Sequence, residues 1–191
     1  PKGPITVEFG TPVVQTDGTV VVTGQVPEGV DGKVTVTVPD GSYEDLTGNP
    51  GKAGTGEGAV DTDRPSVEIT LTPQGSIVIQ YEDDVDPTTI DPKDIVITDE
   101  NGNPIKVELT VSPDGLTLTG QIPPNVDSKV TVIVPEGSYQ DKTGNDGQFD
   151  IDSKIVDTEA PKVTVTVDPQ GNITVTYPED TDPKTIKTET I

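Results

Sequence analysis

Short runs of alternating apolar and polar residues follow one another along most of the chain. In these runs Val and Ile alternate with Thr, Lys and Glu, and no helical period of 3.6 continues beyond a single turn. Alternation with a period of two is typical of strands that bury one face. In the best-defined stretch the sequence predicts strands at residues 67–72, 76–81, 94–98, 105–111, 116–121 and 129–134, with a weaker strand at 154–156.

Turn residues separate these runs. Examples are Pro73-Gln74-Gly75, Asn101-Gly102 and Pro113-Asp114-Gly115. Asn-Gly is the strongest hairpin signal, because a two-residue turn needs positive φ at both central positions. Some seven short strands within about 96 residues match the strand count of an immunoglobulin-like sandwich. The sequence therefore predicts an all-β fold.

The sequence also repeats with a period of 96 residues. Residues 37–51 (TVPDGSYEDLTGNPG) match residues 133–147 (IVPEGSYQDKTGNDG), and 133 − 37 is 96. A second element, Asp-Thr-x-x-Pro, stands at residues 61–65 and again at residues 157–161. Taken as the joint between tandem immunoglobulin-like β-sandwich modules, it divides the chain into three parts. These are the back part of a first module (residues 1–61), a complete module (62–157) and the front part of a third (158–191).

The two incomplete modules leave two interpretations open. The chain is expected to be a window cut from a longer array, or a subunit whose half-modules are completed by neighbouring chains. In either case an isolated copy would expose open sheet edges, which favour head-to-tail association.

Composition narrows the range of functions. The 191 residues carry a formal net charge of −22, and only 29% of them are hydrophobic and 3% aromatic. We therefore expect thin cores of Val, Ile and Leu. The charge argues against nucleic acid and anionic membranes as partners and favours divalent cations. No apolar stretch approaches the roughly 20 residues that span a bilayer, so no membrane insertion is expected in this region.

The chain contains no His, Cys, Met or Trp. This removes the commonest general base, any disulfide framework or thiolate metal site, and the usual transition-metal ligand. Acid pairs such as Asp83 and Asp86 could suggest glycoside hydrolysis, but the sequence offers almost no aromatic surface to hold a sugar. We expect that the protein is not an enzyme.

Carboxylates gather at both joints. Asp61 and Asp63, and likewise Asp157 and Glu159, stand two residues apart before a Pro, a spacing that puts both side chains on one side of an extended segment. Nearby acidic loops contribute the remaining candidates, which are Asp84, Asp86, Asp180 and Asp182. If each loop folds back to its joint, the oxygens could bind calcium. The alternative is a solvated acidic loop.

The Gly-Ser-Tyr-x-Asp-x-Thr-Gly-Asn element supplies two further candidate ligands, Asp45 and Asp141. A turn is the stronger interpretation here, because Asp accepts hydrogen bonds from backbone amides and Gly-Asn adopts left-handed conformations. Tyr43 and Tyr139 are expected at the sandwich edge with their hydroxyl groups bonded to backbone.

These motifs resemble a known class of modules. The run YEDDVDPTTIDPKDIVITDENGNPI (residues 81–105), the run VIVPEGSYQDKTGN (residues 132–145) and the Asp-Thr-x-x-Pro joint are similar to bacterial immunoglobulin-like repeats of giant RTX-type surface adhesins. The glycine-rich nonapeptide of RTX proteins is absent. The resemblance implies an extracellular extender on the bacterial surface, often in biofilm adhesins, with calcium at the joints and neighbouring modules as partners. A ligand-binding adhesive module and a fibre or surface-layer subunit that polymerises head to tail remain as alternatives.

Overall fold

The computed structural model describes residues 3–190 and consists of antiparallel β-sheets joined by turns and short 3-10 helices. The prediction of an all-β fold is confirmed. None of the helices among the described residues has the length and apolar character that a bilayer crossing demands.

The middle of the chain forms a sandwich of two sheets. One sheet has the order β5 (Val67–Leu71), β6 (Ser76–Tyr81), β9 (Thr117–Gln121) and β8 (Thr110–Val111). The other has the order β11 (Asp150–Asp157), β10 (Asp127–Val134) and β7 (Val96–Thr98). Two 3-10 helices, η1 (Pro87–Thr89) and η2 (Pro92–Asp94), cross from β6 to β7.

The core lies between these two sheets. Every second side chain of β5 is buried, as is every second side chain in the last five residues of β10, so the period of two in the sequence is the period of burial. Among the described residues, every buried hydrophobic side chain except Val30 lies between Val67 and Val156. Ile105, Val107 and Leu109 pack against this core from its margin.

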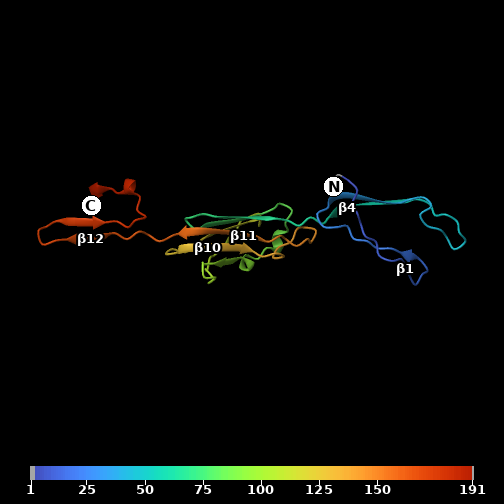
Figure 1. The fold of residues 1–191 in the computed structure, drawn as a ribbon, viewed down its shortest axis with the longest axis horizontal. Coiled ribbons are helices and arrows are strands. Elements are labelled where there is room, and N and C mark those ends of the chain that lie inside the picture. Colours follow the sequence, from blue (N-terminus) through green and yellow to red (C-terminus); the bar gives the residue numbers. More distant parts are fainter. Residues whose placement is uncertain (1–2, 191) are drawn as a thin grey trace.

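The flanking parts of the chain have sheets of two strands only. On the N-terminal side β1 (Val13–Val14) pairs with β2 (Val20–Val21), and β3 (Asp31–Val38) pairs with β4 (Gly54–Asp61). On the C-terminal side β12 (Thr164–Val167) pairs with β13 (Ile173–Thr176), followed by η3 (Pro183–Thr185) and η4 (Thr188–Thr190). The N-terminal part, the sandwich and the C-terminal part follow one another along the long axis (Figure 1).

Two predicted strands differ from the observed ones. Within residues 105–111 only Thr110–Val111 joins a ladder, although Ile105 still bonds through its N–H to the carbonyl of Ile97 (2.8 Å). The weak strand expected at 154–156 extends over all of β11, because β10 pairs with it from Asp127 to Val134. The division into modules at residues 61 and 157 stays a prediction.

The two-residue turn expected at Asn101-Gly102 is wrong. Only Gly102 has a positive φ (80°) there. The N–H of Asp99 instead donates to the carbonyl of Asn103 (2.9 Å), which closes a longer loop. The reason is the Asp99 carboxylate, which accepts the N–H groups of Asn101 and Asn103 (2.9 and 2.8 Å) and so stabilises this wider turn.

Candidate metal-binding site at the two joints

The first joint, residues 61–65, borders an acidic cavity of about 210 Å³. Asp61 ends β4 and lies directly opposite Asp31 in the β3–β4 ladder, so strand pairing brings these two carboxylates together. Pro65 is fully buried and fixes the start of the sandwich. The acidic residues that line the cavity are Asp31, Asp61, Asp63, Glu82 and Asp84.

The second joint, residues 157–161, has an equivalent cavity of about 330 Å³. Asp157 ends β11 opposite Asp127, as Asp61 lies opposite Asp31. Every residue that lines this second cavity is the equivalent, 96 positions on, of a residue that lines the first. Its acidic residues are Asp127, Asp157, Glu159 and Asp180. The repeat in the sequence is therefore also a repeat of a cavity in space.

Six of the predicted ligands line these cavities, namely Asp61, Asp63, Asp84, Asp157, Glu159 and Asp180. Sequence reasoning missed Asp31 and Asp127, which join the site only through strand pairing. The available signal was that Asp31 recurs as Asp127 after 96 residues, in step with the joint.

Asp86 and Asp182 lie outside both cavities. Each is the N-cap of a 3-10 helix with Pro at its first position. The Asp86 carboxylate accepts the N–H and hydroxyl of Thr88 (2.9 and 2.7 Å), and Asp182 accepts the N–H of Lys184 (2.9 Å). The hydrogen bonds from Thr88 lower the pKa of Asp86, so this carboxylate is already satisfied as an anion.

The donor chemistry at the joints fits calcium, which takes carboxylate oxygens from flexible surroundings. The oxygens do not converge, however, and within residues 3–190 no three acidic side chains form a group that could hold a metal ion as they stand. Two of these carboxylates accept hydrogen bonds from neighbouring side chains and backbone. Ser66 donates through its N–H and hydroxyl to Glu82 (2.7 and 2.9 Å), and Thr143 donates its hydroxyl to Asp61 (3.2 Å).

The crowding of negative charge has an electrostatic cost at the first joint. Although Asp84 is exposed as a residue, loss of solvent around its carboxyl group raises its pKa, and the charge of Glu82 raises it further. A bound cation would reverse both effects, because it stabilises the ionised form.

Arg64 distinguishes the first joint from the second. Its guanidinium forms an ion pair with Glu136 (2.7 Å), approaches Glu28 at 3.8 Å and donates to the carbonyls of Asp146 and Gly147 (both 2.9 Å). The hydrogen bond to Glu136 is the main reason that the pKa of Arg64 is raised. Glu28 belongs to the first repeat and the other partners to the sandwich, so Arg64 links the two parts. Ala160 stands at the equivalent position of the second joint.

Asp141 has the contacts of a structural turn. Its carboxylate is buried and accepts bonds from the N–H and hydroxyl of Thr143 (both 2.8 Å) and from the N–H and side-chain amide of Asn145 (2.9 and 2.7 Å). Burial opposes ionisation, but these hydrogen bonds outweigh it and lower the pKa of Asp141. Asp45 makes the matching bonds to Thr47 and Asn49, which favours the turn interpretation at both copies.

The fold and joints define an all-β chain of antiparallel sheets with two equivalent acidic cavities 96 residues apart. No protein-family model matches the sequence, and no curated protein matches it. Among solved structures, the chain is similar to the crystal structure of the N-terminal part of the bacterial S-layer protein SbsC, with 19% identity and a TM-score of 0.39. The match covers 58% of this chain and 32% of the S-layer chain.

Proposed function

We propose that the chain is a structural extender of a bacterial cell-surface protein, with sandwich modules arranged in a row and no catalytic role. The observation that carries this proposal is the pair of equivalent joints, which sit at the two ends of the sandwich in an elongated molecule (Figure 1). Repeated modules with repeated joints are suited to an extended array. The absence of His and Cys from the sequence fits a role without catalysis.

Calcium at the joints is the second part of this proposal. The first joint would hold the ion with Asp31, Asp61, Asp63, Glu82 and Asp84, and the second with Asp127, Asp157, Glu159 and Asp180. The ion would supply positive charge that offsets repulsion among these carboxylates. Extracellular calcium modules bind with a Kd of about 0.1–1 mM. Millimolar calcium, about one to ten times such a Kd, adds about 0.4–1.4 kcal/mol of stability per site.

The test is small-angle scattering and thermal melting of the chain in millimolar calcium and in EDTA. We expect a larger maximum dimension and a higher Tm in calcium. In the variant Asp61→Asn/Asp63→Asn these differences should shrink, because two negatively charged carboxylates at the first joint become neutral amides.

The matched control is Glu100→Gln/Glu108→Gln, which removes the same charge from exposed positions away from the joints. This control should respond to calcium like the parent chain. Equal extension and equal Tm with calcium and with EDTA would remove calcium from the proposal. A chain that bends freely at both joints in either condition would remove the extender role.

A further inference from the structure

The two flanking parts carry opposite halves of the sandwich. The β12–β13 hairpin has the same register as β5–β6, since Val165 lies opposite Val175 as Ile69 lies opposite Ile79. The β3–β4 ladder has the same register as β10–β11, from Asp31 opposite Asp61 to Val38 opposite Gly54. Each flanking part therefore contains one of two strand pairs, β5–β6 or β10–β11, that lie in opposite sheets of the sandwich.

The apolar faces of both halves are exposed to solvent. Val132 and Val134 of β10 are fully buried, whereas the equivalent Val36 and Val38 of β3 are 46% and 45% exposed. On the C-terminal side Val163, Val165, Val167 and Ile173 are at least half exposed, although they occupy the positions of the buried residues Val67, Ile69, Leu71 and Ile77.

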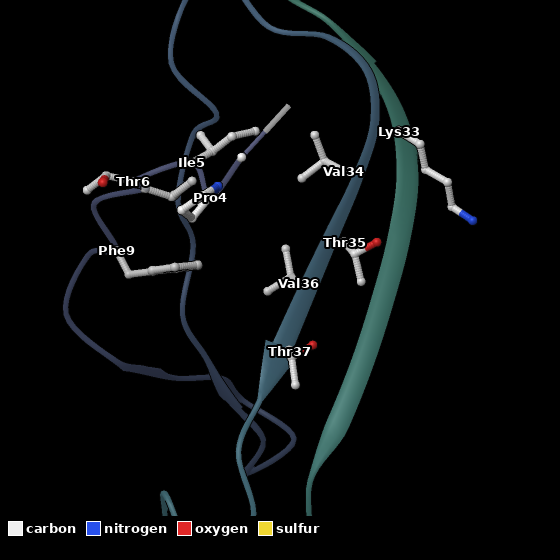
Figure 2. A pocket seen from close by; sticks show the side chains of 11 residues that line it. Pro4, Ile5, Thr6, Phe9, Lys33, Val34, Thr35, Val36 and Thr37 are labelled. Carbon is white, nitrogen blue, oxygen red and sulfur yellow. The ribbon is translucent and has the colours of Figure 1, made fainter. Parts of the chain in front are cut away.

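A groove lies over the exposed apolar face of β3 in the N-terminal part. This cavity of about 610 Å³ is lined by Ile5, Val7 and Phe9 together with Val34 and Val36. Figure 2 shows Ile5 and Phe9 on one side and Val34 and Val36 on the other, all directed into the space between them. Their counterparts in the sandwich contact its core, so the groove lies on the face that a second layer covers in the middle module.

We propose that two copies of this chain associate head to tail, with the β12–β13 hairpin of one copy packing on the apolar face of β3 of the next. The template is the sandwich itself, in which the equivalent residues of β5, β6 and β10 share one core. Together the two halves contain counterparts of β5, β6, β10 and β11, the strands that supply most of the core.

Within the described residues the two halves do not meet. The N-terminal and C-terminal parts lie at opposite ends of the sandwich, so the hairpin of one molecule does not reach its own groove (Figure 1). The contact therefore joins two different surfaces, and such contacts extend into open filaments when the rotation between copies does not close a ring.

The contact must rest on the apolar faces rather than on edge hydrogen bonds. In the sandwich Asp150 and Asp152 of β11 accept the N–H groups of Ile69 and Leu71 (3.2 and 3.0 Å). The equivalent positions of β4 are Gly54 and Gly56, which have no acceptor side chain. The valines are accordingly the residues to change.

Analytical ultracentrifugation of the full 191-residue chain across a range of concentrations provides the test. We expect the parent chain to form elongated species that grow with concentration. Val36→Asp places a charge on the apolar face of β3, and Val165→Asp places one on the face of the β12–β13 hairpin that packs there. Each variant alone should therefore stay monomeric. An equimolar mixture of the two should form a dimer and nothing larger, because only one productive contact remains.

The control variants are Thr55→Asp and Thr166→Asp, which add the same charge to the opposite faces of the β3–β4 and β12–β13 hairpins; Thr55 does not line the groove. These should assemble like the parent chain. The melting transition of the sandwich serves as a folding check for all variants, since none of these substitutions lies in it. A chain that stays monomeric throughout, a mixture that fails to dimerise, or valine variants that assemble like the threonine variants would each overturn the proposal. None of these outcomes depends on calcium or on extension.

Discussion

The β10–β11 and β3–β4 ladders are two copies of one repeat element in two environments, similar in sequence on β10 and β3 and divergent on β11 and β4. Their registers are identical over eight residues, yet Val132 is fully buried and Val36 is 46% exposed. Backbone pairing is thus the same in both copies, whereas the valines are buried only where the second sheet covers them. The register therefore belongs to the repeat element, and the burial of its valines depends on a second sheet.

The tyrosine of the Gly-Ser-Tyr element shows the same difference. Tyr139 is buried, donates its hydroxyl to the carbonyls of Pro65 and Gln148 (3.0 and 3.2 Å), and meets Tyr81 edge to face with ring centroids 4.9 Å apart. Burial raises the pKa of Tyr139 to about 12. Tyr43 has the same neighbours in sequence but is 56% exposed, with one long contact to the carbonyl of Lys52 (3.4 Å).

The largest expected effect on stability distinguishes the two tyrosines. Tyr139→Ala should lower the free energy of unfolding by about 3–5 kcal/mol, because it leaves a cavity in the core and removes the hydroxyl bonds to the carbonyls of Pro65 and Gln148. Tyr43→Ala should change it by no more than about 0.5 kcal/mol in dilute solution. Urea denaturation of the two variants at micromolar concentration measures the difference. Equal losses would mean that the N-terminal part is packed as well as the sandwich.

The next effect concerns pH and the buried turn. Hydrogen bonds lower the pKa of Asp141 in the folded state, so the unfolded chain takes up the proton first. Stability from this group is therefore full above about pH 4 and is lost as the pH falls through the lowered pKa. Asp141→Asn should cost about 1–3 kcal/mol at pH 7 and flatten the decline below pH 4.

Asp45→Asn is the matched control for this acid transition. Asp45 makes the same bonds on an exposed turn, so its replacement should leave the pH dependence of sandwich unfolding unchanged. Urea midpoints between pH 2.5 and pH 7 measure both variants. An acid decline that persists unaltered in Asp141→Asn would show that other carboxylates dominate it.

The sequence predicts those parts of the fold whose pattern is local. The strands at 67–71 and 76–81 follow from β-branched alternation and were predicted to within one residue. Strand β11 gave only a weak signal, because Asp150 and Asp152 break the apolar pattern. Their carboxylates bond to backbone N–H groups of β5, a tertiary role that no periodicity reveals.

The candidate site divides along the same line. Asp61 and Asp63 could be predicted from their spacing before Pro65, whereas Asp31 joins them only through a ladder that spans 30 residues of sequence. Asp86 was predicted as a ligand from its place in an acidic run. The following Pro87 and Thr88 were the signal for a helix N-cap, which uses the carboxylate for backbone bonds.

The smallest expected effect sharpens the comparison of the two joints. Arg64→Ala gives the first joint the residue of the second, Ala160. Since Glu28 and Glu136 are 70% and 64% exposed, their ion pairs with Arg64 contribute little, and the free energy of unfolding should fall by about 1 kcal/mol. The distances across the first joint should nevertheless broaden, because Arg64 joins Glu28 on one side to Glu136 on the other. Spin labels at Thr55→Cys and Thr119→Cys measure this by pulsed electron resonance, and the absence of native Cys keeps the labelling specific.

Ala160→Arg, measured with labels at Thr70→Cys and Thr174→Cys, is the reciprocal control. It should not narrow the second joint, since Pro124 stands where Glu28 stands in the first repeat and offers the guanidinium no partner. Unchanged widths in Arg64→Ala would mean that Pro65 and the bonds of Gln148 to the joint backbone, rather than Arg64, hold the first joint.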